Sequence, residues 1–191
     1  MIKFISSATK LSQYPDSDCE VVFVGRSNVG KSSLINKLYG KVAYVGKTPG
    51  KTRLLNFFDV DGKYTVCDVP GYGYARRSEK EMIEFGEMMD EYFSKRECLK
   101  LCVMILDIRR VPSEDDIDML NYLNDNGINV LFVFNKCDKF SNNQRNNQLK
   151  IIYETLGISG GICISCLKNV NIDVVAKSIE SLIEEKWWIV F

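Results

Sequence analysis

Short hydrophobic runs alternate along the chain with longer segments in which hydrophobic residues recur every three or four positions. The short runs predict strands, and several are hydrophobic at successive positions, which is typical of a sheet covered on both faces. We expect strands at residues 20–24, 54–60, 64–67, 101–106, 130–134 and 161–165. The longer segments predict helices at residues 31–39, 79–95, 113–126, 142–156 and 171–186. This alternation indicates an α/β fold in three layers around a six-stranded, mostly parallel sheet.

Local turn signals refine this arrangement. Asp61-Gly62 predicts a hairpin that makes one edge strand antiparallel, and Gly127 predicts the end of a helix. No repeat or linker divides the chain, so we expect one domain over residues 1–191. The hydrophobic residues 187–191 are too few to span a membrane, and we expect them to pack against the core.

The composition excludes several classes of protein. Of the 191 residues, 46% are hydrophobic and 26% are charged, which argues against a disordered, collagen-like or coiled-coil chain. The sequence contains no histidine, so a Ser-His-Asp triad, an imidazole base and histidine-bound zinc are all excluded within this chain. Any catalysis must use other groups.

Charge is balanced overall but not along the sequence. The 25 basic and 25 acidic residues cancel, yet residues 21–58 contain seven basic residues and no acidic one. The rest of the chain is correspondingly acidic. The basic stretch predicts that a polyanion can bind locally, although the net charge is zero.

Seven cysteines do not form the even set expected of a disulfide framework. Cys163 and Cys166 have Cys-x-x-Cys spacing without a second such pair, so we expect packing thiols, with a redox or metal role as the alternative. The sequence has no signal peptide and no hydrophobic run of transmembrane length, which favours a reduced cytoplasmic setting.

A phosphate-binding motif follows the first of these predicted strands and opens the first predicted helix. Residues 25–32 match the pattern G-x-x-x-x-G-K-S. The glycines let backbone N–H groups surround a phosphate, Lys31 can reach the outer phosphates, and the Ser32 hydroxyl can bind magnesium. The candidate nucleotide contacts in this segment are Gly25, Arg26, Ser27, Asn28, Val29, Gly30, Lys31, Ser32 and Ser33.

A second motif, Asn135-Lys136-Cys137-Asp138, follows the strand expected at residues 130–134. It therefore lies at the carboxyl end of a strand, where ligands bind in sheets of this kind. The carboxylate of Asp138 can accept hydrogen bonds from the ring N–H and the exocyclic amine of guanine, and adenine offers no such pair. Asp138 predicts selection of GTP over ATP, because unpaired polar groups in a closed pocket are costly. A helix cap is the alternative role of this aspartate.

Three further loops complete the candidate site. Asp68-Val69-Pro70-Gly71 places Asp68 to hold a magnesium-bound water and the Gly71 N–H to sense a γ-phosphate. In the loop Thr48-Pro49-Gly50-Lys51-Thr52, Thr52 is a candidate for the second hydroxyl ligand of magnesium, and Thr48 is the competing one. Ile164-Ser165-Cys166 closes the last predicted strand, and we expect its backbone N–H groups to face the base.

The motifs GRSNVGKSS, TPGKT, DVPGYGYA and NKCD, in this order, resemble those of the EngB-type (YihA/YsxC) GTPases in the TrmE-Era-EngA-EngB superfamily. The resemblance extends over nearly the whole chain, including Tyr14-Pro15 and residues 106–112. It implies a Ras-like P-loop GTPase fold, GTP or GDP bound by residues 25–32, and Mg²⁺ bound by Ser32 and Thr52. It also implies a role in maturation of the large ribosomal subunit, with ribosomal RNA and proteins as partners, and a link to cell division and septation.

Two positions in the last loop depart from the family pattern. Cys166 occupies the place of a small residue, and Asn171 stands where glycine is common. Asparagine tolerates a left-handed backbone, so we still expect the loop to form.

Tyr72 follows Gly71, whereas Ras-type sites use a glutamine there to orient the attacking water. We therefore expect intrinsic hydrolysis far slower than ordinary enzyme rates of about 10 per second, until a partner orders the loops. Lys31, Thr52 and Gly71 are the candidate catalytic residues. Asn28 either holds the phosphate loop by hydrogen bonding or helps to bind a K⁺ ion in the place of an arginine finger.

Rival functions and partners follow from the same residues. A phosphate-loop ATPase or small-molecule kinase leaves the motif at residues 135–138 unexplained, and a membrane-transport domain lacks an attached transmembrane segment. A nucleotide-dependent binding module without turnover is favoured by the absence of the glutamine.

We expect a monomer that binds ribosomal RNA through basic side chains, with functionless solvent exposure of these side chains as the alternative. The candidate residues for these RNA contacts are Lys37, Lys41, Lys47, Lys51 and Arg53.

Overall fold

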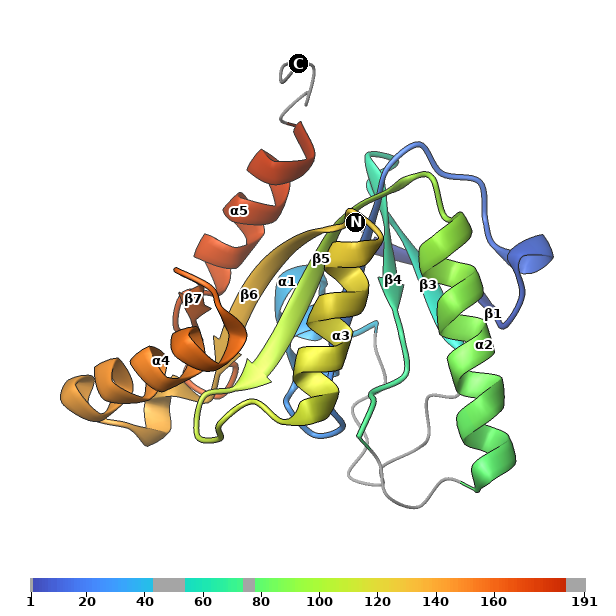
Figure 1. The fold of residues 1–191 in the computed structure, drawn as a ribbon. Helices are drawn as coiled ribbons and strands as arrows, with labels where there is room; N and C mark the ends of the chain where they lie inside the picture. Colours follow the sequence, from blue (N-terminus) through green and yellow to red (C-terminus); the bar gives the residue numbers. More distant parts are fainter. Residues whose placement is uncertain (1, 43–53, 74–77, 185–191) are drawn as a thin grey trace, which may run out of the picture.

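The computed structural model describes residues 2–42, 54–73 and 78–184. A seven-stranded sheet lies at its centre, with helices on both faces (Figure 1). The strands are β1 (Ile2–Ala8), β2 (Glu20–Gly25), β3 (Leu55–Val60), β4 (Tyr64–Asp68), β5 (Leu99–Asp107), β6 (Asn129–Asn135) and β7 (Ile162–Cys163). The α-helices are α1 (Lys31–Tyr39), α2 (Glu79–Lys95), α3 (Glu114–Asp125), α4 (Asn142–Leu156) and α5 (Ile172–Glu184), and short 3-10 helices occur at Leu11–Gln13 and Cys137–Lys139. The predicted α/β architecture in three layers is confirmed.

The strand order is β1-β3-β4-β2-β5-β6-β7. Strands β4, β2, β5, β6 and β7 are parallel, and β3 is antiparallel to both of its neighbours. β3 and β4 form the expected hairpin. Asp61 and Gly62 at its turn have φ angles of 53° and 67°, which is the left-handed conformation that a tight hairpin turn requires.

The predicted number of six strands is wrong, because β1 forms a seventh. It pairs with β3 from Ile2↔Val60 to Ala8↔Leu55, so β3 lies one position inside the edge instead of forming it. Residues 3–5 of β1 are exposed, and the segment lacks the hydrophobic alternation that marks a strand. Its extended conformation depends on pairing with β3, which no local pattern reveals.

Hydrophobic side chains form two core layers, one on each face of the sheet. Along β2, Val22 and Val24 belong to the layer covered by α2, α3 and α4, whereas Val21 and Phe23 belong to the layer covered by α1 and α5. All four side chains are fully buried. This two-sided burial is why β2 is hydrophobic at successive positions.

Three of the helices begin at a serine cap. Ser78, Ser113 and Ser141 each form a reciprocal capping box with the residue three positions later, which determines where α2, α3 and α4 start. Gly127 follows α3 with a φ of 66°, so its predicted role at the end of a helix is confirmed. The starts of α3 and α4 follow the carboxyl ends of β5 and β6, where the candidate motifs also lie.

A buried ion pair stabilises the start of β2, at the opposite end from these motifs. Glu20 is fully buried and accepts hydrogen bonds from Tyr92 Oη at 2.5 Å and Arg96 Nη2 at 2.8 Å. Arg96 also donates to the Pro15 carbonyl oxygen at 2.7 Å. Since a buried carboxylate needs such partners, this network accounts for a charged residue within a hydrophobic strand.

All seven cysteines are free thiols, and four of them are buried. Burial raises the pKa of Cys166 to about 11, so this thiol is protonated near neutral pH. Within residues 2–42, 54–73 and 78–184, no group of three or more Cys, Asp or Glu side chains could hold a metal ion. In the same ranges, every helix is too short or too polar to cross a membrane. The hydrophobic tail at residues 187–191 lies outside the described residues.

Candidate functional site

The phosphate-loop motif connects β2 to α1 at the carboxyl edge of the sheet. Gly25 lies against β5, and a Cβ atom at this position would be 2.6 Å from the Ile105 carbonyl oxygen. Gly30 has a φ of 104°, and a Cβ atom there would collide with the side-chain amide of Asn135. Both positions therefore require glycine, which keeps the loop backbone close to its neighbours and open to a ligand.

The first turn of α1 has the properties of an anion site. Gly30 is its N-cap residue, and no side chain of the described residues caps this turn. The N–H groups at the start of a helix and the positive end of its dipole both favour an anion. Ser32 and Ser33 lie half-buried in this turn, so the Ser32 hydroxyl is next to the position where a phosphate would bind.

Lys31 and Asp68 form a buried ion pair beside this turn. Lys31 is the first residue of α1 and Asp68 is the last residue of β4. Their side chains are only 8% and 4% exposed, and Lys31 Nζ donates to Asp68 Oδ1. The fold thus brings together the candidate phosphate ligand and the candidate holder of the magnesium-bound water.

The loop after β4 lies directly against the phosphate loop. The Ser27 N–H donates to the Tyr72 carbonyl oxygen at 3.1 Å. A Cβ atom on Gly71 would be 3.0 Å from the Ser27 nitrogen, so this close approach favours glycine. Val69 and Pro70 are buried, which leaves their backbone as the part that can contact a nucleotide.

The Tyr72 side chain points into the core. It is buried, and its hydroxyl donates to Asp116 Oδ1 at 2.9 Å. Asp116 lies in the first turn of α3, where its other carboxylate oxygen accepts from the Ser113 N–H at 2.9 Å. Burial and the neighbouring Asp116 charge raise the pKa of Tyr72 far above its ordinary value. The residue in the position of the glutamine is therefore a neutral hydrogen-bond donor within the core.

Asn135 joins three of the predicted loops. Its side-chain Nδ2 donates to the Val29 carbonyl oxygen at 2.9 Å. Its Oδ1 accepts from the Lys136 N–H at 2.8 Å and from the Cys166 N–H at 3.2 Å. One buried amide thus connects the phosphate loop (residues 25–32), the loop at residues 135–138, here called the guanine loop, and the loop after β7.

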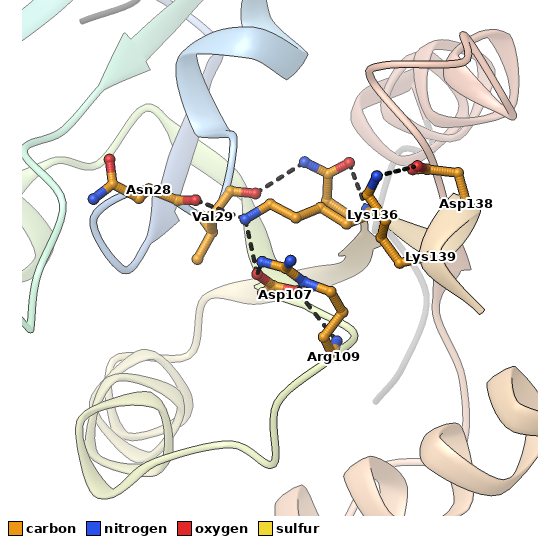
Figure 2. A network of polar contacts seen from close by, with 8 residues as sticks. Asn28, Val29, Asp107, Arg109, Lys136, Asp138 and Lys139 are labelled. Carbon is orange, nitrogen blue, oxygen red and sulfur yellow. Dashed lines mark hydrogen bonds and ion pairs between the residues drawn. The ribbon is translucent and has the colours of Figure 1, made fainter. Parts of the chain in front are cut away.

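Lys136 extends from the guanine loop to the phosphate loop. Figure 2 shows its ammonium group between the Asn28 carbonyl oxygen, at 2.9 Å, and Asp107 Oδ2, at 2.8 Å. Arg109 donates to the same carboxylate from Nε at 2.9 Å and from Nη2 at 2.7 Å. Burial raises the pKa of Asp107, but the hydrogen bonds from Arg109 and Lys136 outweigh this effect and lower it to about 2. Asp107 is consequently ionised near neutral pH.

The sequence motifs assigned no role to Asp107 or Arg109, although both lie in the segment that resembles the family. A signal was present in the chain: Asp107 follows the hydrophobic run at residues 101–106, at the strand end where ligands bind. Its pairing with Lys136 depends on the register of two parallel strands, in which Asp107 lies opposite Asn135.

Asp138 is held by the loop after β7. Its Oδ1 accepts a hydrogen bond from Ser165 Oγ at 2.6 Å, and Lys139 Nζ lies 3.5 Å from its Oδ2. The Ser165 hydrogen bond, more than the nearby Lys139 charge, lowers the pKa of Asp138. An ionised carboxylate in a defined orientation is what recognition of two guanine N–H groups requires.

The loop at residues 164–171 forms despite its departures from the family pattern. Ser165 and Val170 form an antiparallel bridge, with N–H groups that donate to each other's carbonyl oxygens at 3.2 and 3.0 Å. Asn171 adopts the left-handed conformation with a φ of 56°, as expected for asparagine in the place of glycine. The backbones of Ile164 and Cys137 are joined by a hydrogen bond of 3.0 Å, which keeps this loop beside the guanine loop.

The structure describes only some of the remaining candidates. Thr48, Gly50, Lys51 and Thr52 fall outside the described residues, as do Lys47 and Arg53. Lys37 and Lys41 are exposed, on α1 and just beyond it. The Cys137 side chain is buried, so only its backbone can contact a nucleotide.

The described candidate residues for nucleotide binding thus lie at one edge of the sheet. Known proteins with a similar sequence or fold are described as GTP-binding proteins. A probable GTP-binding protein EngB from Geotalea daltonii is 48% identical over 160 residues, which cover 82% of this chain and 77% of that protein. A probable EngB from Geobacter sulfurreducens is 42% identical over 188 residues, covering 96% and 91%. The crystal structure of a probable GTP-binding protein EngB has the same fold, with a TM-score of 0.74 and 24% identity, covering 88% of this chain and all of that one.

Residues 20–136 match the family model described as 50S ribosome-binding GTPase. The match includes the phosphate loop, the Lys31–Asp68 pair and the start of the guanine loop, so the family model covers most of the site described above. The chain therefore belongs to the family of 50S ribosome-binding GTPases, and its relatives are EngB proteins.

Proposed function

We propose that this chain binds GTP and GDP together with Mg²⁺ and hydrolyses GTP slowly, as a switch in assembly of the large ribosomal subunit. One observation carries the proposal: Asn135 ties the phosphate loop to the loops that hold Asp138. Phosphate recognition and guanine recognition are therefore parts of one connected site.

The described residues fit a nucleotide with a magnesium ion. Gly25 and Gly30 leave the loop backbone open, Lys31 supplies a cation for the phosphates, and Ser32 supplies a hydroxyl for the metal. Thr52 is the second proposed metal ligand. Mg²⁺, when bound, neutralises charge on the phosphates. We propose that a phosphate competes with Asp68 for Lys31, which couples nucleotide binding to the loop that carries Gly71.

Slow hydrolysis follows from the position of Tyr72. Its side chain lies in the core and its hydroxyl is bonded to Asp116, so it does not replace a water-orienting glutamine. In this proposal the transferring phosphate is stabilised by Lys31, Thr52 and the Gly71 N–H, without a base that orients the attacking water. The same observation favours a second candidate function, a nucleotide-dependent docking module without significant turnover.

The proposed partner is the large ribosomal subunit or its precursor. The family description names the 50S subunit, and the exposed Lys37 and Lys41 can contribute to binding of ribosomal RNA. We also propose that the chain acts in the cytoplasm as a single-domain monomer, and that its role in assembly links it to cell division and septation. A K⁺ ion at Asn28 is part of the proposal, and equal turnover in K⁺ and Na⁺ at the same ionic strength would remove it.

Competition binding tests the choice of nucleotide. GDP should displace a fluorescent GDP analogue at low concentration, whereas ADP should not. Asp138→Asn should weaken GDP binding by about 100-fold, since one carboxylate that accepts two guanine N–H groups is lost, and should improve binding of xanthosine diphosphate. Equal displacement by ADP and GDP would refute guanine recognition.

Phosphate release separates the two candidate functions. Large ribosomal subunits should raise the GTPase rate of the wild-type chain but not that of Lys31→Ala. Sedimentation with the subunit should depend on whether GDP or a non-hydrolysable GTP analogue is present. Subunit binding without any rise in phosphate release would favour the docking module instead.

A further inference from the structure

The side chain of Lys136 connects two loops that are remote in sequence. Its backbone belongs to the guanine loop, with a left-handed φ of 71° at a non-glycine residue. Its ammonium group reaches the Asn28 carbonyl oxygen of the phosphate loop. A lysine chain has four rotatable bonds, so an extended conformation between two loops requires a fixed group at its far end.

Asp107 provides that group. It ends β5 directly opposite Asn135 in the parallel register, and the Ile108 N–H donates to the Asn135 carbonyl oxygen at 3.1 Å. The Asp107 side chain is only 6% exposed, and its Oδ2 lies 2.8 Å from Lys136 Nζ. The carboxylate thus occupies a rigid strand end immediately beside the flexible lysine.

Arg109 determines the orientation of this carboxylate. It donates to Oδ1 from its backbone N–H at 3.1 Å and from Nε at 2.9 Å, and to Oδ2 from Nη2 at 2.7 Å. Such a two-point arrangement restricts rotation of the carboxylate. Oδ2 is therefore directed at Lys136, as the close-up in Figure 2 shows.

We propose that Asp107, oriented by Arg109, is a positioning residue for nucleotide binding. It holds Lys136 extended between the guanine loop and the phosphate loop, so that both parts of the site are joined before a nucleotide arrives. The proposal rests on the proposed function, since it concerns the same guanine-nucleotide site. Asp107 acts through Lys136, and neither base selection by Asp138 nor the chemistry at the phosphate depends on it.

Dissociation of a fluorescent GDP analogue, followed by stopped flow, tests this role in a double-mutant cycle. Asp107→Asn should accelerate release about tenfold, the equivalent of roughly 1.4 kcal/mol, because a neutral amide holds the ammonium group less strongly. Lys136→Ala should accelerate release at least as much. In the Lys136→Ala background, Asp107→Asn should have little further effect.

A purely structural role of Asp107 predicts a different result. The tenfold acceleration would then persist in the Lys136→Ala background, and this outcome would overturn the proposal. An unchanged release rate in Asp107→Asn would do the same. The ratio of the affinities for GDP and xanthosine diphosphate should stay at its wild-type value in Asp107→Asn, and a changed ratio would also contradict the assignment.

Arg109→Gln is a milder variant, because this side chain is 41% exposed and its loss leaves Lys136 paired with Asp107. It should accelerate release about threefold, roughly 0.65 kcal/mol, and an unchanged rate would refute the orienting role of Arg109. Asp90→Asn is the matched control, since it alters a carboxylate that accepts a hydrogen bond from Tyr122 on α3 instead. It should leave the release rate unchanged.

Failure of the inference can be separated from failure of the proposed function. If the wild-type chain binds no guanine nucleotide, the proposed function is wrong. If the wild type binds GDP and Asp107→Asn releases it at the same rate, only the inference is wrong.

Discussion

Replacing Asp68 with asparagine should destabilise the chain most strongly when no nucleotide is bound. Lys31 and Asp68 are 8% and 4% exposed, so Asp68→Asn would leave a buried ammonium group without its carboxylate. Loss of one partner of a buried ion pair costs about 3–5 kcal/mol. A chain of this size loses about 2–4 °C of melting temperature per kcal/mol, so we expect a decrease of roughly 6–20 °C.

The structure contains a useful reference pair for this measurement. Lys80 and Glu84 lie 3.7 Å apart on α2 with side chains that are 85% and 61% exposed. An exposed pair of this kind contributes about 0–1 kcal/mol, so Lys80→Ala should shift the melting temperature by a few degrees at most. The contrast between the two variants isolates the effect of burial.

Thermal unfolding with and without GDP and Mg²⁺ gives the decisive comparison. A bound phosphate would supply a new partner for Lys31, so the deficit of Asp68→Asn should shrink when the nucleotide is saturating. A ligand at 100 times its dissociation constant stabilises by about 2.7 kcal/mol. At the same ligand concentration this gain should be larger in the variant, because Lys31 is no longer held by Asp68 and the variant should therefore bind the nucleotide more tightly than the wild type. The reasoning would be refuted if Asp68→Asn lowered the free energy of unfolding by less than about 1 kcal/mol without nucleotide. It would also be refuted if the decrease were the same with and without nucleotide.

Two further predictions concern Tyr72 and Asp107. Tyr72→Phe removes the hydrogen bond to Asp116 and should lower the free energy of unfolding, measured by urea unfolding, by about 1–3 kcal/mol. The single-turnover rate of GTP hydrolysis, measured by phosphate release, should stay within about twofold of the wild-type rate. A large drop in this rate would show that the phenol acts in catalysis. The pKa of Asp107 is lowered from 3.8 to about 2, so its contribution to stability is present above pH 4 and is lost as the pH falls through 2. Asp107→Asn should therefore cost about 2 kcal/mol relative to wild type at pH 7, and this difference should shrink to below about 0.5 kcal/mol at pH 2 in urea titrations. A difference independent of pH would contradict the ionised pair.

Most elements of the fold could be predicted because each has a local cause. β2 is hydrophobic at successive positions since both faces are covered, and the turn at Asp61-Gly62 needs residues that accept a positive φ. β1 was not predictable in this way. Its residues are largely exposed, and it is a strand because β3 offers it a hydrogen-bonding partner.

In the candidate site, too, some residues could be recognised from the local sequence, and others depend on contacts that only the tertiary structure forms. Gly25, Gly30 and Lys31 were recognisable because a phosphate loop needs these residue types at this spacing. The ion pair of Asp107 with Lys136 was not recognisable, because the two residues are 29 positions apart and meet only through the register of β5 and β6. The burial of Tyr72 likewise depends on Asp116, 44 positions along the chain.

The sequence by itself determined the succession of strands and helices along the chain from β2 onwards, the phosphate and guanine motifs, and the resemblance to EngB-type GTPases, since these depend on neighbouring residues and their spacing. Only the tertiary structure decided which charged groups meet: Glu20 with Arg96, Lys31 with Asp68, and Asp107 with both Arg109 and Lys136. The physical reason is that a buried charge is tolerable only beside its partner, and the packing of the sheet places that partner.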